Sequence, residues 1–246
     1  MVSSEVWDQR TADEYDATSA EMYLPEVLGP TVDLLAELAG DGPALEFAVG
    51  TGRVALPLVA RGVPVAGIDL SAPMLAQLRR RGGGDDLPVL LGDMATTTVP
   101  GAFSLVYLVW NSLSNLRTQQ EQVACFRNAA RHLVPGGRFV VELWVPPLRR
   151  LPPGQVAVPM STTGDHLVLD TYDVVAQECT SHHYRQQADG TTRYSSGSFR
   201  YAWPAELDLM AQLAGMEPEA RWADWRRSAF TADSTSHVSV WRRPPG

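Results

Sequence analysis

The sequence has few cysteines and no long apolar run, and each absence argues against a class of protein. Cys125 and Cys179 are its only cysteines and lie far apart without CxxC spacing, so neither a disulfide framework nor a zinc site is indicated. No window holds the roughly eighteen uninterrupted apolar residues that a membrane-spanning helix requires. Residues 1–17 are polar and acidic, whereas a secretion signal has a basic start and an apolar core. We therefore expect a cytoplasmic protein with two reduced thiols.

Basic residues are outnumbered by acidic ones. Twenty Lys and Arg stand against 28 Asp and Glu, which gives a formal net charge of −8 at pH 7 and a sequence pI near 5.1. Such a chain repels phosphate backbones unless a local basic patch compensates, and the short arginine run 79–81 is typical of a solvated helix end. The histidines show neither HxxxH nor two-His-plus-acid spacing on a helix. We therefore expect no nucleic-acid partner, no membrane partner and no bound metal.

Apolar runs alternate with helical or loop-like segments over the first 144 residues. Residues 29–40 and 119–133 have the apolar spacing of amphipathic helices, and Gly40 and the turn 135–137 are expected to end them. The apolar runs cover residues 44–49, 63–68, 88–91, 104–109 and 138–143. This alternation is typical of a parallel sheet with helices on both faces. It predicts an α/β fold with a doubly wound, mostly parallel sheet.

The character of the sequence changes at residue 145, where a proline-rich stretch begins. Strand-like segments follow at 166–172, 174–184 and 192–201, with a tight turn at 188–190. A helix at 204–214 and strands at 220–225 and 237–242 are expected to complete the chain. We predict three parts: an N-terminal helical lid segment at 1–40, a cofactor-binding core at 41–144 and 204–246, and a small antiparallel β insertion at 145–203 that lies over the sheet edge and the active site.

A glycine-rich turn follows the first predicted strand. Gly50, Gly52 and Ala55 match the G-x-G-x-x-G/A pattern, and Asp69 ends the next strand. Glycine lets the backbone approach a ligand closely, and an acid at the second strand can accept both ribose hydroxyl hydrogens. These features predict an adenosine-bearing cofactor without saying which one.

Glu46 separates the candidate cofactors. It lies four residues before Gly50, where a buried parallel strand ordinarily carries an aliphatic side chain. A cationic amine at the strand end, reached directly or through backbone and water, would explain a carboxylate there, whereas a pyrophosphate would be repelled. S-adenosylmethionine carries such an amine and has no phosphate.

Four motifs make the sequence resemble the class I (Rossmann-like) S-adenosylmethionine-dependent methyltransferases over residues 46–143. They are EFAVGTG at 46–52, AGIDLSAPML at 66–75, LGDM at 91–94 and HLVPGGRFVVE at 132–142. Ala48 departs mildly from the family, since many members have glycine at that position. The resemblance also implies a reversed terminal hairpin, which the two late strands suit.

The resemblance implies roles for individual residues. Asp69 would bind the ribose hydroxyls, Asp93 the adenine amino group, and Met74 and Met94 would lie against adenine. We predict these cofactor-binding residues: Tyr15, Glu46, Ala48, Gly50, Gly52, Arg53, Asp69, Leu70, Met74, Asp93, Met94 and Trp110. Structural alternatives stay open, with Glu46 as a satisfied buried carboxylate, Asp69 as a helix cap, Asp93 as a loop acid, Met74 as core and Arg53 as a cap of nearby carbonyls.

The methyl acceptor is expected beyond the carboxyl ends of the strands, near Trp110, Asn111 and Ser112. Trp7, Tyr15 and Tyr23 are spaced eight apart, so they could share a helix face over the cofactor or act only as aromatic staples. We predict the acceptor-binding residues Tyr23, Trp110, Asn111, Ser112 and His183, and the catalytic residues His183 and Tyr15. Trp110 has the alternative of a core position.

The sequence favours an enzyme that moves a methyl group to nitrogen or oxygen of a small molecule, such as a natural product or aminosugar. Alignment of the reactants would supply most of the catalysis. The alternatives are an NAD(P)-dependent oxidoreductase with a Rossmann fold and a binding-only S-adenosylmethionine protein. Nucleic-acid methylation is disfavoured because the chain is acidic and lacks a base-flipping motif. Homo-oligomer formation is left open.

Overall fold

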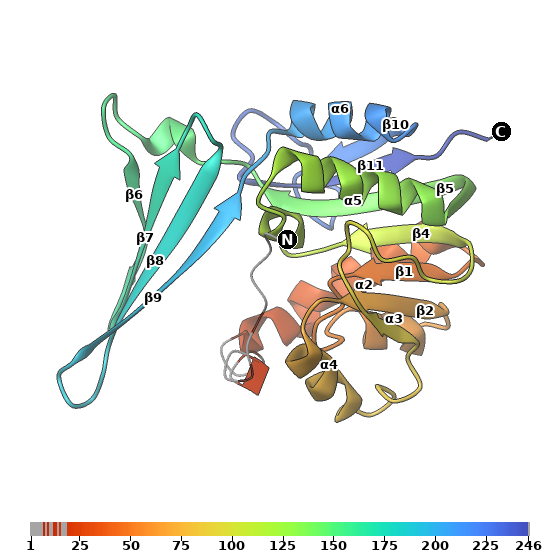
Figure 1. Ribbon diagram of the computed structural model, residues 1–246, viewed down its shortest axis with the longest axis horizontal. Helices are drawn as coiled ribbons and strands as arrows, with labels where there is room; N and C mark the ends of the chain where they lie inside the picture. The colour runs from red at the N-terminus through yellow and green to blue at the C-terminus, as the bar shows by residue number, and fades with distance from the viewer. Residues whose placement is uncertain (1–6, 8, 10–11, 14, 16–18, 246) are drawn as a thin grey trace.

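A seven-stranded sheet forms the body of the protein in the computed structural model, which describes residues 7, 9, 12–13, 15 and 19–245 (Figure 1). Its order is β10-β11-β5-β4-β1-β2-β3. The strands are β1 (Ala44–Phe47), β2 (Val65–Asp69), β3 (Val89–Leu91), β4 (Phe103–Leu108), β5 (Leu133–Trp144), β10 (Glu217–Trp222) and β11 (Ser236–Arg242). Strands β1 to β5 pair in parallel, while β11 is antiparallel to both of its neighbours. The predicted parallel sheet and reversed terminal hairpin are confirmed.

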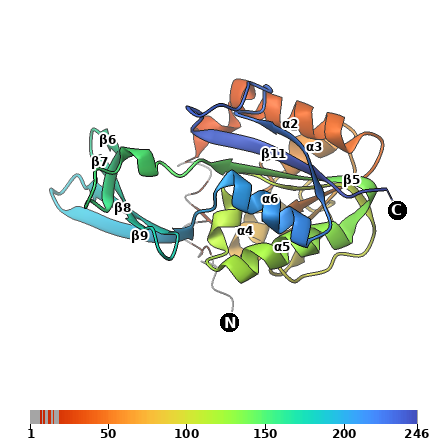
Figure 2. The ribbon, with the colours of Figure 1, turned by 90° about the horizontal axis from the view of Figure 1, so that it is seen from above.

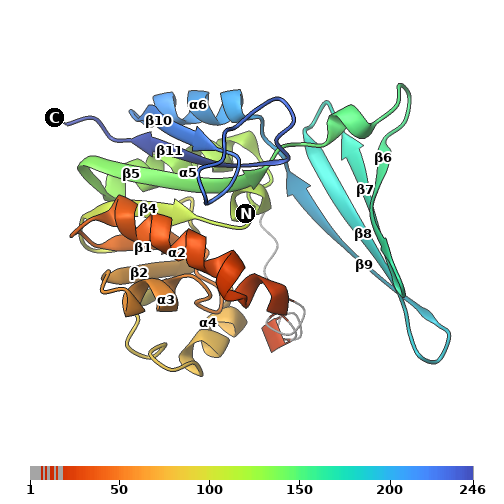
Figure 3. The ribbon, with the colours of Figure 1, turned by 180° about the vertical axis from the view of Figure 1, so that it is seen from behind.

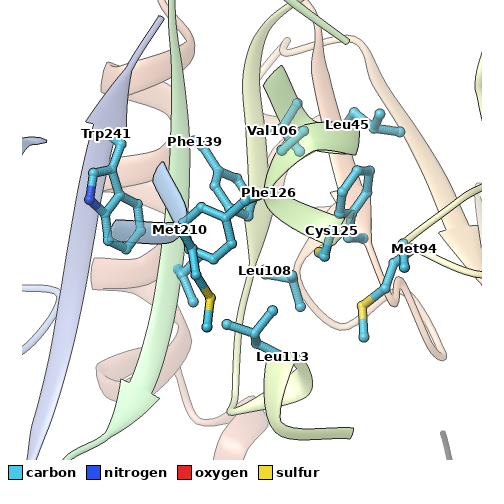
Figure 4. Packing of buried hydrophobic residues seen from close by; sticks show 14 of the residues in the cluster. Leu45, Met94, Val106, Leu108, Leu113, Cys125, Phe126, Phe139, Met210 and Trp241 are labelled. Carbon is cyan, nitrogen blue, oxygen red and sulfur yellow. The ribbon is translucent and has the colours of Figure 1, made fainter. Parts of the chain in front are cut away.

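Helices cover both faces of this sheet (Figures 1 and 3). They are α2 (Pro25–Ala39), α3 (Ala55–Ala60) and α4 (Ala72–Arg79) on one face, and α5 (Gln119–His132) and α6 (Pro204–Leu213) on the other. Strand side chains alternate between the two layers, so Leu45 and Phe47 pack toward α5 while Ala44 packs toward α2. On the α5 side, Phe126 meets Phe139 and Trp241 edge-on, with ring centroids 5.0 and 5.2 Å away (Figure 4).

Two helix boundaries differ from the sequence prediction. Helix α2 begins at Pro25, which occupies the first turn, so Pro30 lies inside the helix and not at its start. Helix α5 begins with a capping box, in which Thr118 and Glu121 satisfy each other's backbone N–H groups, and ends at His132. The turn 135–137 therefore does not end α5. It lies within β5, where the pairing with β4 shifts between Phe103 and Leu105.

The insertion forms a separate four-stranded antiparallel sheet in the order β6-β7-β8-β9. Its strands are β6 (Ala157–Thr163), β7 (His166–Asp173), β8 (Glu178–Gln186) and β9 (Thr192–Arg200). The sequence prediction missed β6 because Pro159 lies inside it, and an edge strand is where a sheet tolerates proline. Figures 1, 2 and 3 show this sheet extending outward from the body. Its position over a bound acceptor stays a prediction.

The root of the insertion joins the body through Arg200 at the end of β9. Its guanidinium donates to the side chains of Gln122 on α5 (2.6 Å) and Glu206 on α6 (2.7 Å). Strand β9 also contacts the short 3-10 helix η2 (Ser112–Asn115), which follows β4. The insertion is therefore anchored beside the carboxyl ends of the parallel strands. None of the helices in the described part of the chain combines the length and apolar character that crossing a bilayer requires.

Candidate active site

A pocket lies at the carboxyl ends of the central strands, where doubly wound sheets bind ligands. Its empty volume is about 670 Å³ including the open mouth. Nine of the predicted site residues line it: Tyr15, Ala48, Gly50, Asp69, Leu70, Met74, Asp93, Met94 and Ser112. Five lining residues were not predicted: Trp7, Ile68, Ser71, Gly92 and Asn115. Each of these except Trp7 lies within three residues of a predicted one.

The glycine turn at the floor of the pocket has a left-handed backbone. Gly50 and Gly52 have φ angles of 56° and 78°, and Ala48 has a φ of 55° without being glycine. A Cβ atom on Gly52 would lie 2.3 Å from Leu78 Cδ1, so a larger residue would displace that side chain and also strain the positive φ. Gly52 therefore supports the turn and does not line the pocket. The conformation of Ala48 explains why glycine suits this position in the family.

Asp69 ties the glycine turn to the end of β2. Its Oδ2 accepts the Gly50 N–H (2.7 Å) and its Oδ1 accepts the Ser71 N–H (2.8 Å). Burial raises the pKa of Asp69, while these backbone hydrogen bonds oppose the shift. Each carboxylate oxygen keeps a further lone pair for an incoming hydroxyl group. The side chain can therefore hold the turn and accept from a ribose at the same time.

Glu46 lies in the core beneath the pocket and does not line it. Its Oε2 accepts the Tyr107 hydroxyl at 2.9 Å, and both side chains are buried. Burial raises the pKa of Glu46 to about 8, although the Tyr107 hydrogen bond and the Arg53 charge oppose the shift. Sequence reasoning missed Tyr107, although aligning β1 with β4 places it directly beside Glu46. A contact between Glu46 and a cofactor amine stays a prediction.

Arg53 follows the glycine turn and does not line the pocket. Its Nη1 lies 3.5 Å from the Met22 carbonyl oxygen, and its guanidinium lies 5.8 Å from the centroid of the Trp110 ring. The carbonyl contact agrees with the capping alternative. Binding of a methionine carboxylate by Arg53 stays a prediction.

The wall beside Asp69 is formed by the segment after β3, whose Gly92 N–H donates to the Asp69 carbonyl at 2.8 Å. Asp93 and Met94 line the pocket together with Met74 from the first turn of α4. The Asp93 Oδ1 accepts the Ala95 N–H at 2.8 Å, which stabilises the loop. Met74 and Met94 are nearly fully buried. Two methionine side chains with a carboxylate beside them suit a purine ring that carries an amino group.

The N-terminal segment reaches the mouth of the pocket. The Ser71 hydroxyl donates to the Trp7 carbonyl at 2.6 Å, and the Trp7 and Tyr15 rings meet edge-on with centroids 5.2 Å apart. Tyr23 is placed elsewhere, with its hydroxyl 3.0 Å from the Thr51 Oγ1 and its ring beneath the Arg81 guanidinium. Trp7 is not helical, so the three aromatics do not share one helix face. Trp7 and Tyr15 therefore both line the pocket at the predicted lid, whereas Tyr23 does not line it.

The predicted acceptor residues divide between the pocket and its surroundings. Ser112 lines the pocket, while Trp110 and Asn111 lie just before it with φ angles of 53° and 59°. Trp110 is 42% exposed, so it is not a core residue. His183 lies on β8, where its Nδ1 is 3.1 Å from the His166 Nε2, and it does not line the pocket. Burial and the neighbouring His166 lower the pKa of His183, which keeps it neutral near pH 7.

Some known proteins resemble this chain over its body alone, and others resemble it over almost its whole length. A family model described as a methyltransferase domain matches residues 44–137. The solved structure of the CcbJ methyltransferase from Streptomyces caelestis is 37% identical, with 95% of this chain and 96% of that chain covered and a TM-score of 0.84. The cypemycin N-terminal methyltransferase of a Streptomyces species is 28% identical over 93% of this chain and 97% of its own length.

A third relative resembles only part of the chain. It is the dTDP-3-amino-3,6-dideoxy-alpha-D-glucopyranose N,N-dimethyltransferase of Streptomyces fradiae, 37% identical over 46% of this chain and 43% of its own.

The lining of the pocket suits S-adenosylmethionine. Asp69 keeps lone pairs for ribose hydroxyl groups beside the glycine turn, the two methionines offer apolar side chains, and none of the described residues that line the pocket is an arginine. S-adenosylmethionine is the cofactor, and the chain belongs to the class I S-adenosylmethionine-dependent methyltransferases of natural-product type.

Proposed function

We propose that the protein transfers a methyl group to an amine nitrogen of a small natural product. The main support is the likeness of the whole chain, insertion included, to the CcbJ methyltransferase. The pocket lined by the predicted cofactor-binding residues agrees with it. Relatives named for amine substrates support nitrogen over oxygen, since one methylates a peptide N-terminus and another an aminosugar. An amine that binds in its neutral form also needs little help from a base.

The residues of the chain supply binding, orientation and exclusion of water. Asp69 would hold the ribose hydroxyls, Asp93 would accept the adenine amino group, and Met74 and Met94 would enclose the ring. When bound, S-adenosylmethionine supplies an electrophilic methyl group on a sulfonium. Trp7 and Tyr15 would close the mouth and exclude water, since both line the pocket. Such alignment of two reactants can lower a barrier by about 7–11 kcal/mol.

The two predicted catalytic residues are not equally supported. Tyr15 lines the pocket, whereas His183 lies on the insertion beside His166. We therefore propose Tyr15 as the residue that orients the acceptor nitrogen. His183 is neutral near pH 7 because its pKa is lowered, and it could accept a proton only if the insertion moved closer.

Ligand-dependent thermal stability and a transfer assay test this function together. S-adenosylhomocysteine should raise Tm, while NAD should not, because only a ligand that binds the native state stabilises it. Transfer of a labelled methyl group to a panel of matched amines, alcohols and phenols should favour the amines. Stabilisation by NAD alone would support an oxidoreductase, and transfer to alcohols alone would contradict the proposed nitrogen acceptor.

We further propose that the protein acts in the cytoplasm on a free small molecule, without nucleic acid. The net charge of −8 and two free, buried cysteines support this environment. Sedimentation of the purified protein measures whether it forms the homo-oligomer that the sequence leaves open.

A further inference from the structure

Two tryptophans are exposed side by side where β4 and β5 end. Trp110 is 42% and Trp144 is 58% exposed, and their ring centroids lie 6.3 Å apart at an interplanar angle of 70°. Large apolar side chains that are exposed together, within a polar surround, usually mark a binding surface. The pair stands at the carboxyl ends of parallel strands, which is the side of the sheet that binds ligands.

The backbone beneath Trp110 is held in a strained conformation. Trp110 and Asn111 are consecutive non-glycine residues in the left-handed region, with φ angles of 53° and 59°. Such conformations persist only where the surroundings impose them, and they concentrate at functional sites. The next segment of chain, η2, carries Ser112 and Asn115, which line the cofactor pocket. The strained turn therefore continues directly into the pocket wall.

Glu142 on β5 holds this turn in place. Its Oε2 accepts the Trp110 N–H at 2.8 Å, and its backbone carbonyl accepts the Asn111 N–H at 3.2 Å. Its Oε1 accepts the indole N–H of Trp225 at 2.8 Å, so both carboxylate oxygens are engaged. The Asn111 side chain in turn accepts the Trp144 N–H at 2.6 Å. One network therefore fixes both exposed tryptophans relative to the pocket.

The chemistry of this surface favours a ring next to an amine. Indole faces pack against the apolar faces of rings, and they also attract a neighbouring ammonium group. Each carboxylate oxygen of Glu142 already accepts one N–H, and these two hydrogen bonds assign Glu142 to holding the turn. The Arg53 guanidinium already lies over the Trp110 ring, 5.8 Å from its centroid, so it would repel an ammonium group placed at that same face.

We infer that Trp110 and Trp144 form the acceptor-binding surface, that it selects acceptors with an apolar ring face beside the amine, and that Glu142 is the positioning residue that holds it. This inference rests on the proposed function, because it assumes an amine acceptor. Its new elements are Trp144, Glu142 and the ring requirement. The surface recognises the acceptor body, whereas the pocket recognises the cofactor.

The ring requirement is tested by titrating the protein, saturated with S-adenosylhomocysteine, with benzylamine and with n-butylamine while following tryptophan fluorescence. Benzylamine should bind roughly fivefold to tenfold tighter than n-butylamine, because its ring can make aromatic contacts with the two indoles in addition to burying apolar area. Trp144→Ala should reduce this ratio to about one without changing S-adenosylhomocysteine affinity more than about twofold. Equal binding of the two amines by the unaltered protein, or an unchanged ratio in Trp144→Ala, would overturn the inference.

The role of Glu142 is tested with Glu142→Gln against the matched charge change Glu219→Gln. Glu219 on β10 forms an ion pair with Arg138 on β5, across the intervening strand β11. It does not line the pocket. Glu142→Gln should raise the KM of benzylamine roughly tenfold and reduce the preference for benzylamine over n-butylamine. The reason is that either the Trp110 N–H or the Trp225 indole N–H loses its carboxylate acceptor. Glu219→Gln should change neither. A loss of thermal stability in Glu142→Gln with an unchanged ratio would show a purely structural role.

The two experiments separate failure of the inference from failure of the proposed function. Methyl transfer to both amines at equal KM would retain the proposed function and overturn the ring requirement. Tight S-adenosylhomocysteine binding with no transfer to any amine would overturn the amine acceptor itself, and with it the inference.

Discussion

The seven-stranded body and the four-stranded insertion are built on different principles. The body contains two large apolar clusters, one on each face of its sheet, and its central strand β1 is buried along its whole length. The insertion has one small cluster, in which Val158, Tyr172, Cys179 and Tyr201 are the buried residues. Most side chains of β9 are exposed. The body can therefore fold around its own core, whereas the insertion depends on its attachment.

Similarity to some known proteins is confined to the body, and similarity to others includes the insertion. The methyltransferase family model ends at residue 137, before the insertion begins, and the aminosugar relative from Streptomyces fradiae matches less than half of the chain. The CcbJ structure covers both regions. The family model thus ends before the insertion, whereas the likeness to the CcbJ structure includes it.

The largest effect is expected at the junction of the two regions, in Arg200→Ala. Arg200 is buried and forms an ion pair with Glu206 at 2.7 Å. Removing one partner of a buried pair leaves an uncompensated charge and costs about 3–5 kcal/mol. Urea denaturation should therefore show a large loss of unfolding free energy. The control Arg61→Ala removes an exposed pair with Asp33 and should cost at most about 1 kcal/mol. Equal losses in the two variants would mean that the insertion needs no such anchor.

The next effect concerns the body alone, in Asp69→Ala. Loss of hydrogen bonds to a charged group costs about 1.5–3 kcal/mol, so S-adenosylhomocysteine should bind roughly 10- to 150-fold more weakly in calorimetry. The variant should also lose some stability, because Asp69 accepts from Gly50 and Ser71. Asp189→Ala on the insertion serves as control, since Asp189 bonds only within its own turn. Unchanged affinity in Asp69→Ala would place the ribose elsewhere.

A pH-dependent effect is expected from Glu46→Gln. The pKa of Glu46 is about 8 in the folded protein and its ordinary value is 4.5, so the unfolded chain binds fewer protons between these pH values. Stability therefore falls as pH rises through this window, by about 2 kcal/mol between pH 5.5 and 7.5 from this group. Urea denaturation at both pH values should show a smaller difference in Glu46→Gln than in the unaltered protein. The same difference in both proteins would argue that Glu46 is ionised throughout.

The smallest effect is expected in the insertion, in His183→Ala. Because His183 does not line the pocket, turnover at saturating cofactor should change by less than about twofold, whereas loss of a general base costs about 10²–10⁴-fold. Tyr15→Phe, measured in parallel, should reduce turnover more. A large loss in His183→Ala would restore this residue as the base and would require the insertion to close over the site.

Sequence alone predicts the body well, because its signals are local. Apolar runs and the glycine turn lie within short segments, so they indicate both the parallel sheet and the floor of the pocket. Asp69, Asp93 and the two methionines line the pocket as the motifs imply. Strand β6 was missed because proline within a segment argues against a strand, although an edge strand of a sheet tolerates it.

Contacts between distant segments could not be predicted in the same way. Tyr107 reaches Glu46 across 61 positions, and Glu142 reaches Trp110 across 32. Such pairs depend on which strands are neighbours in the sheet, and no periodicity within one segment carries that information. The eight-residue spacing of the N-terminal aromatics indicated a shared face, but their positions are set by Ser71 and Arg81 on the body.

The hydroxyl of Ser71 links the N-terminal segment at the pocket entrance to helix α4 of the body. It accepts the Met74 N–H at the start of α4 and donates to the main-chain carbonyl of Trp7. Because this hydrogen bond is made to the backbone carbonyl and not to a side chain, the residue at position 7 can change without loss of the bond. Substitution of the ring at position 7 could therefore alter the pocket lining while the backbone at the pocket entrance stays in place.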